Sequence, residues 1–202
     1  MADKIVSRTK YLRKEHRRFY MFHLFHRSSS IYLIIGLVII LFGFTLYNVY
    51  KQQNVVFSLI MFGITCAIFP YLIISKINNV VKQETPERVR STDIIEVTKH
   101  KISRANDVIS GKAVIGWNEL DCVCEDDEFI YLYTSDNSGL FIKKADIVEG
   151  DIESFRKIAL DNIGRDKKGN PRYKRYGNVR KEYNAKMNEK KKQEKLAKKG
   201  NK

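Results

Sequence analysis

Two long apolar runs constrain this chain more than any other feature. Residues 31–50 read "IYLIIGLVIILFGFTLYNVY", residues 54–75 read "NVVFSLIMFGITCAIFPYLIIS", and neither contains a charged residue. Roughly 20 helical residues, at about 1.5 Å each, cross a hydrocarbon core about 30 Å thick. We therefore expect a transmembrane hairpin over residues 31–75. The alternative is a buried hairpin in a globular core, although such helices usually keep a polar face.

The connection between the runs and the charges around them predict the topology. Only "KQQ", residues 51–53, joins the runs, so the two helices must be antiparallel neighbours. Basic residues crowd the other end of the hairpin, with Arg17, Arg18 and Arg27 before it and Lys76 after it. The positive-inside rule then predicts that both termini are cytoplasmic. Neither run contains Asp, Glu, Lys, Arg or His, so the usual residues of an ion path or proton relay are missing.

Residues 1–30 form a basic juxtamembrane segment in this interpretation. Phe19, Phe22 and Phe25 recur at three-residue spacing, which is typical of a short helix at a membrane surface. In that position Arg17, Arg18 and Arg27 would reach anionic head groups. A helix that packs on the protein's own cytoplasmic domain is the alternative. Residues 76–91, which contain Pro86, are predicted to be a polar linker.

Residues 92–164 are predicted to form a small α+β domain. "DIIEV", "HKISRAN" and "SGKAVIGW" indicate strands, and "LDCVCE" and "FIYLYTS" are separated by the acidic turn "DDE", which favours a hairpin. "LFIKKADI" adds another strand. An amphipathic helix follows over "IESFRKIALDNIG", with Gly150 or Asp151 as its N-cap and Gly164 as its C-cap. About seventy residues bury only a marginal core.

Trp117 is the only tryptophan of the chain, and we expect it in the core of this domain with Leu120 and Phe155. A large aromatic side chain buries about 150–250 Å², a substantial share of so small a core. An exposed Trp117 that inserts into lipid or holds a ligand is the functional alternative.

No residue pattern indicates catalysis, a cofactor or a metal ion. Cys122 and Cys124 lie two apart on one strand without a second pair, which is a weak zinc signal and a poor geometry for a disulfide. Glu125, Asp126, Asp127 and Glu128 could chelate a cation, but a hairpin turn also needs solvated polar residues. No glycine-rich phosphate loop or Ser-His-Asp set is present. We therefore expect a protein without enzymatic activity.

The last part of the chain, residues 165–202, is dense in lysine and poor in aliphatic residues, and the whole chain has a net charge of +14. Such a composition predicts a tail that is disordered or only partly helical. Its cations would contact anionic lipid, each contributing about 1 kcal/mol. The membrane-surface residues predicted here are Lys167, Lys168, Arg172, Lys174 and Arg175. Nucleic acid bound through residues 165–202 is the alternative, with Tyr173, Tyr176 and Tyr183 interspersed, and a solubilising tail is a third possibility.

The stretch "IGWNELDCVCEDDEFIYLYTSDNSGLFIKKADI" and the "IESFRKI" helix, behind a membrane hairpin with a very short loop, resemble the bacterial YcxB-like family. The resemblance covers roughly Thr9 to Ile163. It implies a pleckstrin-homology-like (PH-like) fold, an antiparallel sheet closed by a C-terminal helix, and no enzymatic activity. Where the family tends to have Pro-Lys-Arg, this chain has Lys143, Lys144 and Ala145, which puts any role of that proline corner in doubt.

The resulting hypothesis is a multi-pass protein of the bacterial inner membrane that acts as a non-enzymatic adaptor or regulatory anchor. Its expected partners are the lipid bilayer with its anionic head groups, an unidentified protein and, as a possibility, a second copy of the chain. A membrane-tethered nucleic-acid binder is the alternative function.

Overall fold

The computed structural model describes residues 4–28, 30–51, 54–83, 91–108, 111–134 and 138–200. The chain forms two compact units: a hairpin unit, Tyr11–Val89, and a sheet unit made of Met1–Lys10 together with Arg90–Lys202. The sheet unit is thus assembled from both sides of the hairpin unit in the sequence.

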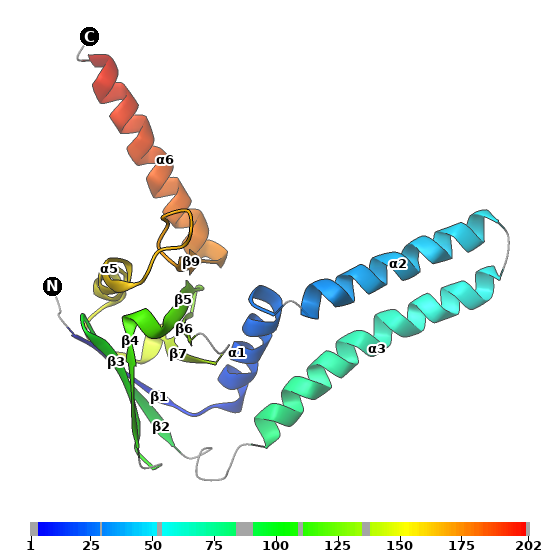
Figure 1. Ribbon diagram of the computed structural model, residues 1–202, viewed down its shortest axis with the longest axis horizontal. Helices are drawn as coiled ribbons and strands as arrows, with labels where there is room; N and C mark the ends of the chain where they lie inside the picture. Colours follow the sequence, from blue (N-terminus) through cyan, green and yellow to red (C-terminus); the bar gives the residue numbers. More distant parts are fainter. Residues whose placement is uncertain are drawn as a thin grey trace. The chain divides into compact units, whose positions relative to one another are not determined.

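The hairpin unit contains three helices: α1 (Arg13–His26), α2 (Ser30–Tyr50) and α3 (Val55–Lys82). Helices α2 and α3 run antiparallel side by side (Figure 1). In their most apolar windows only 17% and 6% of the residues are buried. Both helices are long and apolar enough to cross a membrane, and their exposed apolar surface does not fit the alternative of a hairpin buried in a globular core.

A buried polar contact joins α2 to α3 near their connecting turn. The Asn48 amide donates a hydrogen bond to the Ser58 hydroxyl at 2.7 Å, and the Thr45 hydroxyl donates to the Leu41 carbonyl at 2.9 Å. Because most side chains at this level are apolar, the Asn48–Ser58 bond specifies which turns of the two helices face each other.

The sheet unit contains two sheets. The first has the strand order β4-β3-β2-β1-β8 and is antiparallel throughout. The second has the order β7-β6-β5-β9 and is mixed, because β9 pairs with β5 in parallel. The strands are β1 (Lys4–Lys10), β2 (Thr92–Thr98), β3 (Lys101–Asn106), β4 (Lys112–Gly116), β5 (Leu120–Glu125), β6 (Phe129–Thr134), β7 (Gly139–Lys143), β8 (Ile147–Glu149) and β9 (Tyr173–Arg175).

Helix α5 (Ile152–Asn162) closes the sheet unit, and helix α6 (Gly177–Gly200) follows β9. The side chain of Asp151 accepts a hydrogen bond from the Ser154 N–H at 2.8 Å, so Asp151 is the N-cap of α5. The predicted combination of two long apolar helices, antiparallel strands and a closing helix is confirmed. The mixed second sheet was not predicted.

Strand β1 is the largest departure from the expected domain division. We assigned residues 1–30 to a juxtamembrane segment, but Lys4–Lys10 lies inside the first sheet, between β2 and β8. Its register with β2 runs from Lys4 opposite Thr98 to Lys10 opposite Thr92. Ile5 is fully buried, so β1 supplies both main-chain bonds and core contacts that residues 92–164 lack.

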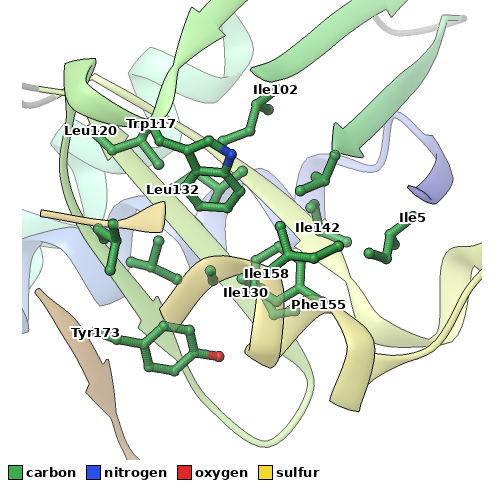
Figure 2. Packing of buried hydrophobic residues seen from close by; sticks show 14 of the residues in the cluster. Ile5, Ile102, Trp117, Leu120, Ile130, Leu132, Ile142, Phe155, Ile158 and Tyr173 are labelled. Atoms are coloured by element: carbon green, nitrogen blue, oxygen red, sulfur yellow. The ribbon is translucent and has the colours of Figure 1, made fainter. Parts of the chain in front are cut away.

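The core of the sheet unit lies between the sheets and α5 (Figure 2). Trp117, in the short 3-10 helix η1 (Trp117–Glu119) after β4, is 5% exposed, Leu120 is 1% exposed and Phe155 is fully buried. The indole N–H of Trp117 donates to the carbonyl of Thr98 at 2.9 Å. All three residues that we expected in the core therefore lie in it, and the exposed alternative for Trp117 does not hold.

Of the two predictions for the tail, disorder is wrong for the described residues 165–200, whereas a partly helical tail agrees with α6. Strand β9 pairs with β5 over Tyr173–Arg175, and Tyr173 is buried. The sequence suggests disorder because lysine dominates the segment. A few residues near its start nevertheless make specific contacts with the sheet unit, and these contacts order it.

Candidate functional site

A buried carboxylate lies at the centre of the contacts that join the second sheet to α5 and β9. Glu125, the last residue of β5, has no exposed surface. Lys144 lies 2.7 Å from its Oε1 atom, the Arg156 Nε donates to Oε2 at 3.1 Å, and the Tyr173 hydroxyl donates to Oε2 at 2.8 Å. We call Glu125, Lys144, Arg156 and Tyr173 the Glu125 cluster.

The electrostatics of the Glu125 cluster keep the carboxylate ionised. Burial alone would raise the pKa of Glu125, but the hydrogen bonds from Arg156, Lys144 and Tyr173 outweigh burial and hold the pKa below its ordinary value. Burial and the adjacent Glu125 carboxylate raise the pKa of Tyr173, so its hydroxyl keeps its proton and donates. Both oxygens of Glu125 accept hydrogen bonds from the protein. The cluster therefore links β5 to α5 and β9.

The acidic turn after Glu125 also makes specific contacts. Asp126 accepts hydrogen bonds from the Phe129 N–H at 2.7 Å and from the Tyr131 hydroxyl at 2.9 Å, and it thereby shapes the β5–β6 turn. Among the described residues, no group of three or more His, Cys, Asp or Glu side chains could hold a metal ion. Cys122 and Cys124 are buried, and their Sγ atoms lie 3.7 Å apart.

Asp127 anchors the start of α6. Its Oδ1 accepts from the N–H groups of Asn178 at 2.9 Å and Val179 at 3.2 Å, about fifty residues later in the chain. Gly177 has a φ of +59°, and a side chain there would meet the Asp127 carboxylate at 3.0 Å. The carboxylate therefore caps the helix across the fold, and glycine provides both the conformation and the space for it.

Arg175 makes a second link between α6 and the sheet. Its guanidinium lies 4.7 Å from the centre of the Tyr173 ring and 4.0 Å from the centre of the Tyr183 ring. Cation–π contacts of this kind contribute about 0.5–2 kcal/mol each. With the Asp127 cap, they fix the first two turns of α6 on the sheet unit.

A cleft of about 360 Å³ lies between α5 and α6. Leu160, Val179 and Tyr183 give it an apolar strip. Charged residues of both signs line the rest of it: Glu153, Arg156, Lys157, Asp161, Arg175, Glu182 and Lys186. Arg156 reaches from this wall into the Glu125 cluster and also pairs with Glu153. The α5–α6 cleft is therefore a concave surface with charges of both signs. Through Arg156, one of its walls is held in place by the buried Glu125 cluster.

Beyond this cleft, α6 is a positively charged arm. Residues 177–200 contain nine Lys or Arg and three Glu, and the described side chains from Asn184 to Gln193 are all exposed. At about 1.5 Å per residue the helix is about 36 Å long. Its apolar residues Val179, Tyr183 and Met187 lie at four-residue spacing near its start. The described part of the helix offers a broad cationic surface and only this narrow apolar strip.

The predicted membrane-surface residues divide into exposed cations and residues that belong to the fold. Lys167, Lys168 and Lys174 are exposed. Arg172 and Arg175 are partly buried: the Arg172 guanidinium packs against Gly164, and Arg175 lies against the two tyrosines. In the hairpin unit Arg17 and Lys76 are exposed, whereas Arg18 and Arg27 are partly buried.

Several residues of this arrangement had a visible signal that sequence reasoning missed. "KIVSRTK", residues 4–10, is rich in β-branched residues and short enough for one strand. "Gly-Asn" at residues 177–178 precedes a helix-forming stretch, which favours a helix start. The pairing of Glu125 with Tyr173, by contrast, joins residues far apart in the chain and has no local signal.

The fold and this site define a class of protein: a two-sheet domain with a closing helix, interrupted by a pair of apolar helices. The comparison with protein families then gives a narrower result. Residues 105–159, from the end of β3 to α5, match the family model described as YcxB-like protein, which confirms the resemblance for that segment. No curated protein and no solved structure matches the chain. The hairpin unit, β9 and α6 lie outside the matching segment.

Proposed function

We propose that this protein is a non-enzymatic adaptor or regulatory anchor of the bacterial inner membrane. The observation that carries the proposal is the position of the apolar hairpin: α2 and α3 lie between Lys10 and Thr92, which are paired neighbours in one sheet. The chain leaves the sheet after Lys10 and re-enters it at the neighbouring Thr92. If α2 and α3 each cross the bilayer once in between, both ends of the hairpin lie on the same side of the membrane, and the sheet unit lies on that side. The basic flanks support a cytoplasmic location for that side.

The sheet unit supports a PH-like role in protein binding. Four antiparallel strands in the order β4-β3-β2-β1, a β5–β6–β7 meander and the closing helix α5 are the parts that a PH-like domain requires. In this proposal the α5–α6 cleft takes a segment of a protein partner, with apolar side chains over Leu160 and Tyr183 and charged ones at the rim. The partner could also be a second copy of this chain, in which case the same cleft would form the interface of a homo-oligomer.

Helix α6 supports a role at the membrane surface. Its cations would gain about 1 kcal/mol each from anionic lipid when the domain lies close to the bilayer. The alternative of nucleic-acid binding was based on the dense positive charge of the tail, with Tyr173, Tyr176 and Tyr183 interspersed. The Tyr173 hydroxyl donates to Glu125 and the Tyr183 ring lies against Arg175, so these two rings are already engaged within the domain, which supports the lipid proposal.

The test of this proposal measures hydrogen exchange of the full-length protein in nanodiscs. We expect the amides of α6 to be protected in discs that contain phosphatidylglycerol, relative to discs of phosphatidylcholine alone. Lys190→Gln with Lys191→Gln should reduce this protection, whereas the matched pair Lys101→Gln with Lys112→Gln, exposed residues of β3 and β4, should keep it. Equal exchange in both discs, with tail-dependent nucleic acid recovered by ultraviolet crosslinking in cells, would establish the alternative function instead.

A further inference from the structure

The hairpin unit contains an apolar hollow of about 420 Å³. Its lining comes from three helices: Met21 and Phe25 of α1, Ile34 and Val38 of α2, and Cys66 and Pro70 of α3. Its lining is almost entirely apolar. Cys66 and Pro70 are smaller than most of their neighbours along α3, and Val38 of α2 lines the same hollow. Water has few hydrogen-bond partners in such a place, so the hollow suits hydrocarbon.

The hollow has one end at the predicted membrane surface and the other inside the bilayer. Met21 and Phe25 belong to α1, which precedes the first span, whereas Val38 lies seven residues into the apolar run. Seven residues of helix rise about 10 Å. A groove of this depth fits the first part of an acyl chain.

Two cations lie on the helix face of α1 that leads to the hollow. Lys14, Arg17, Met21 and Phe25 are spaced by three, four and four residues, which places them along one side of the helix. The side chains of Lys14 and Arg17 are exposed. Burial and the adjacent Arg27 hold the pKa of His23 below its ordinary value, so His23 adds little positive charge to α1 at neutral pH.

We propose that the hairpin unit binds one anionic phospholipid, with an acyl chain in the hollow and the phosphate at Lys14 and Arg17. The inference depends on the proposed membrane insertion and adds a specific site to it. Charge complementarity favours a phospholipid as the occupant. A second copy of this basic chain would bring further cations to Lys14 and Arg17, whereas a phosphate group brings the opposite charge. A zwitterionic lipid fits the hollow equally well but lacks the net charge.

The experiment uses the full-length protein in phosphatidylcholine vesicles that carry a trace of a lipid with a diazirine in its acyl chain. The photolabile lipid is either phosphatidylglycerol or phosphatidylcholine with identical chains, and labelled peptides are mapped by mass spectrometry. We expect phosphatidylglycerol to label the segments around Val38 and Cys66 about tenfold more than phosphatidylcholine does. Leu33 and Ile40, highly exposed positions on α2, should be labelled equally by both lipids.

Two sets of variants separate the contribution of the cations Lys14 and Arg17 from the contribution of the apolar hollow. Lys14→Gln with Arg17→Gln should remove the preference for phosphatidylglycerol, whereas Lys101→Gln with Lys112→Gln, exposed residues of β3 and β4, should keep it. Val38→Trp should lower labelling in the hollow by both lipids, and Ile40→Trp should not.

Equal labelling of the hollow by both lipids in the unaltered protein, or crosslinks from the hollow to a second copy, would overturn the lipid site and leave membrane anchoring intact. Absence of label from both α2 and α3 would overturn membrane insertion, and the site with it.

Discussion

Glu125 offers the sharpest test of how the sheet unit is held together. Its carboxylate is fully buried between Lys144, Arg156 and Tyr173. Glu125→Gln keeps the shape of the side chain but removes the buried counter-charge of Lys144 and leaves Arg156 with only the exposed Glu153. Loss of one partner from a buried ion pair costs about 3–5 kcal/mol. With a urea dependence of about 2 kcal/mol per molar, the unfolding midpoint should fall by about 2 M.

The assay can be done on the intact protein, because Trp117 is the only tryptophan and lies in the core of the sheet unit. Its fluorescence in detergent micelles reports unfolding of that unit without a contribution from α2 or α3. Glu153→Gln is the matched control: Glu153 pairs with the same Arg156, but 75% of its side chain is exposed. An exposed pair contributes about 0–1 kcal/mol, so the midpoint should move by less than about 0.5 M.

The same cluster predicts a pH dependence with a definite sign. The pKa of Glu125 is lower in the folded protein than its ordinary value. The stability that ionised Glu125 provides is therefore fully present above its unfolded-state pKa of about 4.3, and it is lost as the pH falls from there through the folded-state pKa. Glu125→Gln should remove this part of the acid sensitivity. The reasoning fails if Glu125→Gln and Glu153→Gln shift the midpoint equally, or if Glu125→Gln leaves the acid transition unchanged.

Three further predictions concern separate elements. Trp117→Ala should destabilise the sheet unit by about 3–5 kcal/mol in pulse proteolysis of the full-length protein, and a loss below about 1 kcal/mol would contradict its place in the core. Asp127→Ala should remove about 0.5–2 kcal/mol from the start of α6, seen as faster hydrogen exchange at residues 178–180, whereas Glu128→Ala should leave those amides unchanged. Deletion of residues 1–10 should expose Trp117 to solvent although β1 lies more than 100 residues away in the chain, and native Trp117 emission in that variant would show that β1 is dispensable.

The sequence was informative wherever the signal was local. Apolar runs marked α2 and α3, alternating residues around the acidic turn marked β5 and β6, and Asp151 marked the start of α5. The position of Trp117 followed from its size alone. For the helices and the hairpin, neighbours in the chain determine the structure, because these elements are made of local contacts.

The rest depended on pairing between distant residues. Strand β1 needs β2, which lies beyond the whole hairpin unit, and Tyr173 needs Glu125. The composition of residues 165–202 indicated disorder because it averages over many lysines. A few contacts, at Asp127, Glu125 and Arg175, are enough to order the first two turns of α6.

The inserted hairpin also bears on how the sheet unit can fold. Lys10 and Thr92 must meet, and residues 11–91 form the loop between them. Closing a flexible loop of about 80 residues costs about 2 kcal/mol more than closing one of about 10, since the entropy cost grows as (3/2)RT ln n. An antiparallel hairpin that has already formed brings its two ends together and removes most of this difference. The Asn48–Ser58 bond, which fixes the register of α2 against α3, therefore also favours the pairing of β1 with β2.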